Sequence, residues 1–260
     1  MRAIPEKLLA IPTLLSLGNS SGSGFIYRSD KFIYLVTAKH VLFDNKDELR
    51  NNELELVYQT ININDESVTR IRIDLSLIKH MYHKVCDACI VQIGKIKFRQ
   101  GHATTVDYLS GVERLETGYS EPTITGRNKT LLLEDVSVSN DIYVFGYPTS
   151  LGLKSSPQFD YNKPLIRRGI VANVFKSAKT IILDCSVYPG NSGGPVIQSR
   201  LIDNKIDLNL IGIISQNIPY VQSWKNERDK IEHIEYLNSG YSVATSFDAI
   251  LELIDLIEQK

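Results

Sequence analysis

The sequence predicts an all-β protein that ends in a single α-helix. Most of the chain consists of short β-like runs, each bounded by clusters of Gly, Ser, Asn or Asp, the residues that form turns between strands. No helical pattern alternates with these runs, which favours barrels or sandwiches over a parallel sheet. Helical spacing of apolar residues occurs at the C-terminal end, at positions 247, 250, 251, 254 and 257.

Six β-like runs fill the first hundred residues and predict a first β-domain over residues 1–100. They are LLSLG, GSGFIYR, FIYLVTA, LELVYQ, VTRIRIDLSLI and ACIVQIGKI. The opening residues have Glu6 and two prolines among apolar positions, which favours an irregular lead-in to the first strand over a signal peptide. Residues 101–128 contain four glycines and lose the strand rhythm, so we expect them to connect two domains.

A second group of runs predicts a second β-domain over residues 129–245. They are KTLLLEDVSV, DIYVFGY, LIRRGIVANVF, KTIILDCSV, GGPVIQ, LNLIGIIS and YSVATS. Residues 246–260 form the predicted helix, with Ser246 as its N-cap. The stretch 218–240 is charged, and we expect a surface loop or short helix there.

The bulk composition excludes several classes of function. The chain has 260 residues and a formal net charge of -1, which gives no reason to expect a nucleic acid or a membrane as partner. The cysteines are odd in number and few, so we expect free thiols packed in or beside strands and a reducing, cytoplasmic location. His80 and His83 lack companion ligands for a metal and are expected at the surface.

The most specific motif is the string PGNSGGPV at residues 189–196. Glycines on both sides of a serine allow a tight turn with unusual backbone angles. We expect the N–H groups of Gly190 and Ser192 to converge as an oxyanion hole, with the Asn191 N–H as a helper and Ser192 as the nucleophile. A Gly-rich turn with a capping serine is the simpler interpretation of a bare GxSG, but it does not account for the whole string.

A serine nucleophile needs a base, and the base needs a carboxylate that fixes its tautomer. His40 lies in TAKHV at the end of the apolar run FIYLV, and Asp87 opens the run DACIV. We therefore predict a catalytic triad of His40, Asp87 and Ser192. The alternative, the G-x-S-x-G elbow of α/β-hydrolases, requires a helix after the serine and the order Ser, Asp, His. Here PVI follows the string and indicates a strand.

With these motifs the chain resembles the chymotrypsin-fold serine peptidases, and most closely the Deg (high-temperature-requirement) branch and its stand-alone bacterial relatives. TAKHV resembles their histidine motif and DACIV their aspartate motif. Further strings agree in order: VFGYP at 144–148, GIV at 169–171, GIIS at 212–215 and VAT at 243–245. The resemblance implies two six-stranded antiparallel β-barrels with the site in the crevice between them. No segment matches a PDZ domain, so Deg-type substrate capture and trimer regulation are not implied.

The resemblance also implies residues that bind substrate. It places Ser186, Asn217 and Ser242 around the pocket for the residue before the cut, and Ser215 beside the substrate. The sequence thus predicts a serine endopeptidase that acts through an acyl-enzyme on protein or peptide substrates, without a metal or cofactor. A regulatory protein partner would bind through 218–240. The alternative is a catalytically silent peptide-binding module of the same fold.

Overall fold

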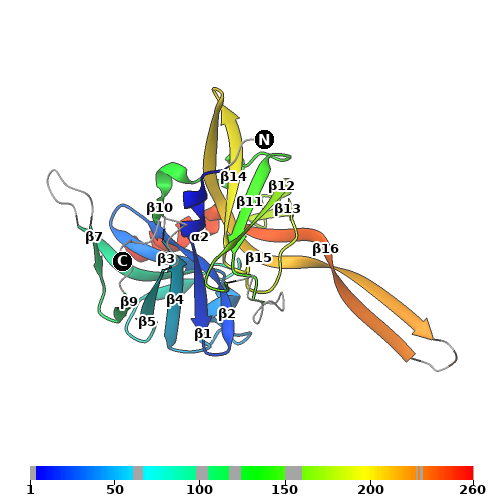
Figure 1. The fold of residues 1–260 in the computed structure, drawn as a ribbon, viewed down its shortest axis with the longest axis horizontal. Coiled ribbons are helices and arrows are strands. Elements are labelled where there is room, and N and C mark those ends of the chain that lie inside the picture. Colours follow the sequence, from blue (N-terminus) through cyan, green and yellow to red (C-terminus); the bar gives the residue numbers. More distant parts are fainter. Residues whose placement is uncertain are drawn as a thin grey trace.

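The computed structural model describes residues 4–60, 67–97, 105–116, 124–149, 160–226, 228 and 231–259. The described chain forms two β-sheets, a C-terminal helix and a long hairpin that projects from the body (Figure 1). The predicted all-β class with one C-terminal helix is confirmed. The few other helical segments are short, namely α1 and three 3-10 turns.

The first sheet is curled and has ten strands, in the order β6-β7-β3-β2-β1-β4-β5-β9, with β10 paired to β2 and β8 paired to β7. A 3-10 turn at Glu6–Ala10 leads into it, as the irregular opening predicts. The strands are β1 Pro12–Leu17, β2 Ser20–Arg28, β3 Phe32–Thr37, β4 Glu53–Gln59, β5 Val68–Asp74, β6 His80–Tyr82, β7 Cys89–Lys97, β8 Thr105–Tyr108, β9 Val112–Glu116 and β10 Ile124–Gly126.

Residues 101–128, expected only to connect the domains, contribute β8, β9 and β10 to this sheet. The first unit is therefore a curled ten-stranded sheet that extends past residue 100, rather than a closed six-stranded barrel. Gly111, counted as a linker glycine, has a φ of 97° at the turn between β8 and β9, a conformation that favours glycine. The glycines of this stretch thus mark turns between strands as well as connections.

The second sheet is a closed six-stranded barrel, as the resemblance implies. Its strands follow the order β11 Asp141–Gly146, β12 Leu165–Phe175, β13 Thr180–Asp184, β16 Ile231–Ser246, β15 Lys205–Asn226 and β14 Pro195–Ile202. Every pairing is antiparallel. Closure gives each strand a partner on both sides within the barrel, so no edge remains there.

The prediction of a strand at KTLLLEDVSV, residues 129–138, is wrong. Its first residue ends the 3-10 turn Arg127–Lys129, and its middle forms a second 3-10 turn, Leu133–Asp135. The Leu131 N–H donates to the Leu210 carbonyl at 2.9 Å, and the Leu133 N–H donates to Asp248 Oδ2 at 2.9 Å. Because these partners satisfy the backbone, the leucines lie against the barrel without joining a strand ladder.

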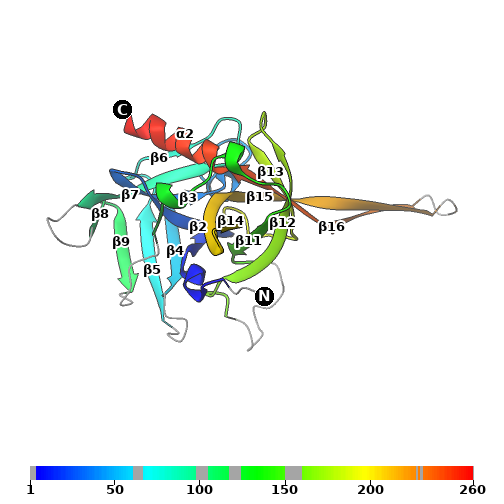
Figure 2. The same ribbon diagram turned by 90° about the horizontal axis from the view of Figure 1, so that it is seen from above.

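The C-terminal helix α2, Phe247–Glu258, packs against the first sheet (Figure 2). The Phe247 ring lies 4.8 Å from that of Tyr27, centre to centre, and the Tyr34 hydroxyl donates to Glu258 Oε1 at 3.1 Å. Ser246 occupies the predicted N-cap position, but its hydroxyl makes no capping hydrogen bond. Among the described residues, no helix is long and apolar enough to cross a membrane.

The prediction of a loop or short helix at 218–240 is also wrong. These residues are the outer parts of β15 and β16, which pair from Pro219 opposite Asn238 to Asn226 opposite Ile231. We call residues 219–226 and 231–238 the arm. Both faces of the arm are exposed, so charged residues are interspersed with the β-forming residues Ile, Tyr, Val and Trp. This mixture obscures the strand pattern in the sequence.

Candidate active site

Strand pairing brings the predicted base and the predicted acid together. β3 ends at Thr37 and β7 begins at Cys89, and these two residues are paired across the sheet. His40 lies in the short helix α1, Lys39–Leu42, just after β3, while Asp87 lies just before β7. Two residues 47 positions apart therefore meet at one end of the sheet.

Two hydrogen bonds fix the His40 ring relative to Asp87. His40 Nδ1 lies 2.7 Å from Asp87 Oδ2, and the His40 backbone N–H donates to Asp87 Oδ1 at 3.1 Å. A third donor comes from the second barrel, where the Ser215 hydroxyl lies 3.0 Å from Asp87 Oδ2. Thr245 Oγ1 lies 2.9 Å from the same hydroxyl. Ser215, expected beside the substrate, thus also orients the acid.

These contacts set the charge of Asp87. Burial alone raises the pKa of this carboxyl, but the hydrogen bonds and charge of His40, together with the Ser215 hydroxyl, outweigh burial and hold the pKa below its usual range. Asp87 is therefore ionised wherever an ordinary aspartate is ionised, and in somewhat more acidic solution as well. An ionised carboxylate at Nδ1 leaves Nε2 of His40 free to act as a base.

The loop that carries Asp87 is held by the C-terminal helix. His83 Nδ1 accepts the N–H groups of Val85 and Cys86 at 3.1 and 2.8 Å, and its Nε2 lies 3.0 Å from Glu252 Oε2 of α2. Lys179 pairs with the same carboxylate. The hydrogen bond from Lys179, together with that from His83, lowers the pKa of Glu252 despite partial burial. His83, expected at the surface, is largely buried by this network.

The serine loop requires glycine at three positions. Gly190 and Gly193 have φ values of 100° and 81°, which L side chains rarely adopt. A Cβ atom at Gly190 would lie 2.2 Å from the Tyr147 carbonyl oxygen, and one at Gly194 would lie 2.2 Å from that of Phe145. The unusual backbone predicted from the string is therefore present.

The N–H groups of this loop are not equivalent. Asn191 N–H donates to the Tyr188 carbonyl at 2.9 Å, and Asn191 Oδ1 accepts the Tyr188 N–H at 3.0 Å. This donor is engaged in a turn and is not available to an oxyanion, contrary to the expectation for Asn191. Within the described residues, the N–H groups of Gly190 and Ser192 donate to no other group. They remain the two candidate oxyanion donors.

Ser23 of β2 ties this loop to the first sheet, and sequence reasoning missed it. Its hydroxyl donates to the Gly190 carbonyl at 2.7 Å and accepts the Tyr147 N–H at 3.0 Å. Its backbone N–H donates to the Ser192 carbonyl at 2.8 Å. Ser23 is fully buried. The feature of the sequence that could have identified it is a polar residue between two glycines within a strand.

A cleft of about 750 Å³ lies between the two sheets and is lined by His40, Asp87 and Ser192. The hydrogen bonds of the described residues do not include one between Ser192 and His40. Such a bond is often long without substrate and shortens when the complex forms. The structure therefore gathers the three predicted residues at one cleft, with His40 and Asp87 already hydrogen-bonded to each other.

The predicted pocket residues divide into two groups. Asn217 and Ser215 line the cleft, together with Val187, Tyr188, Pro189, Gln216 and Val243. Ser186 and Ser242 are not part of its wall. Ser242 is fully buried, and its hydroxyl donates to the Cys185 carbonyl at 2.9 Å, so it faces the barrel interior.

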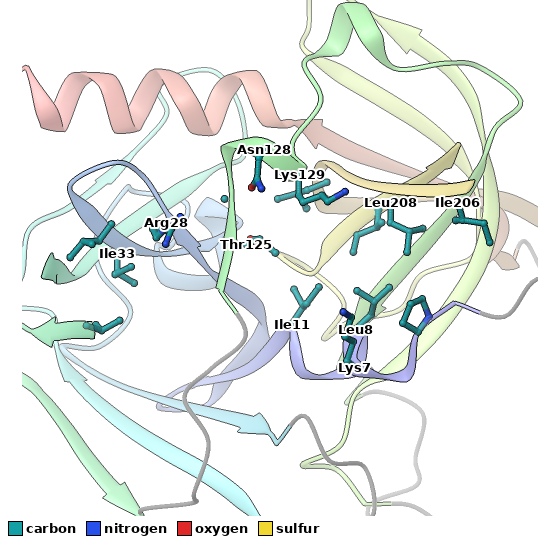
Figure 3. Close-up of a pocket in the computed structure, with 16 residues that line it drawn as sticks. Lys7, Leu8, Ile11, Arg28, Ile33, Thr125, Asn128, Lys129, Ile206 and Leu208 are labelled. Carbon is teal, nitrogen blue, oxygen red and sulfur yellow. The ribbon is translucent and has the colours of Figure 1, made fainter. Parts of the chain in front are cut away.

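A second hollow of about 560 Å³ shares no lining residue with the cleft. Figure 3 shows Leu8 and Ile11 of the lead-in across from Leu208 of β15, with Lys7, Arg28 and Lys129 also in the lining. Its walls are mainly aliphatic and carry no histidine, serine or cysteine. Its described lining contains no histidine or carboxylate beside a serine or cysteine, so the candidate triad chemistry belongs to the cleft.

Comparison with known proteins agrees with this geometry. The model of the trypsin-like peptidase domain matches residues 22–201, which include His40, Asp87 and Ser192. The chain belongs to the trypsin-like peptidase family. Among solved structures, this peptidase domain is similar to an HtrA-type protease, AlgW with tripeptide, with a TM-score of 0.54 and 15% sequence identity. The match covers 99% of this chain and 64% of that chain, and at this identity it shows the fold alone. No curated protein matches the sequence.

Proposed function

We propose that this peptidase is a serine endopeptidase with Ser192 as nucleophile, His40 as general base and acid, and Asp87 as the group that orients His40. The observation that carries the proposal is the 2.7 Å contact between His40 Nδ1 and Asp87 Oδ2 at the wall of the cleft that Ser192 also lines. A histidine held in this way presents Nε2 toward the cleft in the tautomer that accepts a proton.

The proposed reaction has two halves. His40 Nε2 accepts the proton of the Ser192 hydroxyl as its oxygen attacks a peptide carbonyl, and the N–H groups of Gly190 and Ser192 stabilise the oxyanion. The tetrahedral intermediate then collapses, the C–N bond breaks, and His40 donates the proton to the leaving amine. Water attacks the acyl-enzyme by the same route and releases the acid and free Ser192. No step requires a metal or cofactor.

The cleft wall supports a preference for an uncharged residue before the cut. Among its described lining residues, Asp87 is the one acidic side chain, and it is bound by His40 and Ser215. A buried Lys or Arg side chain without a counter-charge is strongly disfavoured. Val187, Asn217 and Val243 instead offer apolar and neutral polar contacts.

The test is digestion of β-casein, an unfolded protein, by the purified full chain. We expect fragments cut after uncharged residues and no cleavage by Ser192→Ala. The competing function, a silent peptide-binding module, predicts that both proteins bind casein and neither cuts it. Cleavage that survives in Ser192→Ala would overturn the assignment of the nucleophile.

The three cysteine thiols are relevant to the cellular location of the protein. Cys86, Cys89 and Cys185 are buried and unbridged, and burial raises the pKa of each, to about 11 for Cys185. Such thiols are weak nucleophiles and behave as small apolar side chains. They support the expectation of a reducing, cytoplasmic location.

A further inference from the structure

The arm is a two-stranded ribbon beside which no other described strand or helix lies. In both views it projects from the body, and no other element lies along it (Figures 1 and 2). All of residues 231–238 are exposed, and so are most of residues 219–225. An isolated two-stranded hairpin is only marginally stable in water.

The arm carries large apolar side chains on both of its faces. Tyr220 is opposite Leu237 in the register, and Val221 is opposite Tyr236. Because successive residues of a strand point to opposite faces, these two pairs lie on different faces. Tyr220 is 57% exposed and Tyr236 is 70% exposed. Clustered apolar exposure of this kind marks a surface that binds a partner.

The arm is continuous with the catalytic cleft. β15 lines the cleft at Ser215, Gln216 and Asn217 and then runs on without a break to Asn226. Asn238 Nδ2 donates to the carbonyl of Val187 in the cleft wall at 2.8 Å, which fixes the base of the arm. A peptide that lies extended beside Ser215–Asn217 is therefore directed along β15 toward the arm.

One edge of β15 is open along this path. β16 occupies the other edge, whereas β14 pairs with β15 only up to Ile213, and the serine loop bonds to Ile214. Beyond Ile214, no described strand pairs with that edge. Pro219 has no N–H, and proline in a strand is accommodated when its nitrogen faces the unpaired edge. By alternation, the backbone groups of Val221, Ser223 and Lys225 then face the same open edge.

We propose that the arm is an extension of the substrate site, on which an extended polypeptide substrate adds as a third strand along the open edge of β15. This proposal depends on the proposed peptidase function. Backbone hydrogen bonds to Val221, Ser223 and Lys225 would hold the added strand, and its alternating side chains would lie beside Val221 on one face and beside Tyr220 and Trp224 on the other. The substrate class is therefore unfolded protein with β-branched or aromatic residues at alternate positions on one side of the cut.

The test uses two series of quenched peptides built on one site that the full chain cuts in β-casein. The casein site is the common core, and one series extends it on the amino side and the other on the carboxyl side with alternating Val and Thr. The longest extension has about eight residues, enough to span the arm at ~3.3 Å per residue. A matched series carries Gly-Ser extensions. We expect kcat/KM to rise by about tenfold with Val-Thr extensions on one side only, the equivalent of a few cross-strand pairs.

Backbone methylation separates strand addition from simple apolar contact. N-methylation at alternate positions of the extension removes N–H donors without changing side chains. We expect methylation to abolish the gain when it falls on the residues whose N–H groups face β15, which are every second residue of the extension. Methylation of the residues between them should have little effect. A gain that is insensitive to N-methylation, or that is equal from both sides, contradicts the proposal, as does the absence of any gain.

Two variants test the protein side. Ser223→Pro removes one N–H at the open edge, and Ser223→Ala is its matched control; we expect only the proline variant to lose part of the length dependence. In a shortened arm, Asn-Gly joins Gln222 to Glu235, a pair already in register. We expect this variant to cut the unextended core at the wild-type rate and to lose most of the gain from extension, because it removes Ser223 and Lys225 and keeps only Val221 of the three open-edge residues.

The two proposals fail in distinguishable ways. If the unextended core is cut in a Ser192-dependent manner while extension has no effect, the arm proposal is wrong and the peptidase assignment stands. If neither is cut, the peptidase assignment itself fails. If light scattering shows that the wild type is a dimer and the shortened arm a monomer, with unchanged length dependence, a second copy occupies the arm and the proposal is overturned.

Discussion

The serine loop and the arm adjoin in the second barrel but satisfy their backbone groups in opposite ways. In the serine loop, Ser23, Tyr188 and Ile214 engage most polar groups, and glycine is required where a Cβ atom would lie 2.2 Å from a neighbouring carbonyl oxygen. In the arm, the outer edges of both strands have no described partner strand, and both faces meet solvent. Under the two proposals, the catalytic groups are fixed before substrate arrives, whereas recognition beyond the cleft is completed by the substrate itself.

Removing the proposed nucleophile is the most severe test of the serine loop. Ser192→Ala is expected to lower kcat by about 10⁶-fold, and His40→Ala by a similar factor, because triad members act as a unit. Cleavage of a casein-derived peptide gives the rate. The Tm of Ser192→Ala should stay near that of the wild type, because the hydroxyl lies at the cleft and carries little packing.

Changing the acid tests whether orientation of His40 matters as much as its presence. Asp87→Asn keeps the shape of the side chain but presents an amide that favours the wrong imidazole tautomer, so kcat is expected to fall by about 10⁴-fold. Ser215→Ala, which removes one of the hydrogen bonds to Asp87, is the milder companion. Equal rates for Asp87→Asn and wild type would show that the 2.7 Å contact has no catalytic role.

Ser23 tests whether the first sheet holds the oxyanion donors in place. Ser23→Ala leaves the Gly190 carbonyl and the Tyr147 N–H without their partner, so the free energy of unfolding is expected to fall by about 1–3 kcal/mol. We expect kcat to fall by about ten- to a hundredfold with little change in KM, since a displaced oxyanion donor weakens the transition state selectively. Ser21→Ala is the control, because Ser21 lies on the same strand and its hydroxyl contacts only Thr149. Loss of stability with unchanged kcat would assign Ser23 a purely structural role.

Glu252 tests the most distant support of the site and should give the smallest effect. The pKa of Glu252 is lowered, so its stabilising contribution is present above the pKa of the unfolded chain and is lost as pH falls through the folded value. Glu252→Gln is expected to cost less than about 1 kcal/mol at neutral pH, because the carboxylate is partly exposed and screened by solvent. Melting curves of both proteins should converge in acid. A constant difference at every pH would contradict the charge-based explanation.

The three predicted triad residues meet at one cleft, and the sequence could indicate them because their requirements are local. The string around Ser192 demands glycine, and His40 and Asp87 each lie at the end of an apolar strand. Sequence reasoning missed what depends on distant contacts. Ser23 and Gly190 are 167 positions apart, so the two glycines that flank Ser23 can mark it as unusual but cannot show which group its hydroxyl meets.

The errors in the fold have a related cause. The arm is exposed on both faces, so it lacks the one-sided apolar alternation by which strands are found. The strands β8, β9 and β10 are short, and β9 and β10 pair with strands distant in sequence, so the glycine content and the lost strand rhythm suggested a connection. The run KTLLLEDVSV has strand-like composition, but Asp248 and Leu210 satisfy its backbone instead.

The most direct measurement of the central claim is labelling with a fluorophosphonate probe followed by peptide mapping. The probe forms a stable bond only with a serine whose proton a neighbouring base removes. We predict a single adduct, on Ser192, that is absent in Ser192→Ala and strongly slowed in Asp87→Asn. An unlabelled wild-type protein that still binds casein, or an adduct on another serine, would contradict the account.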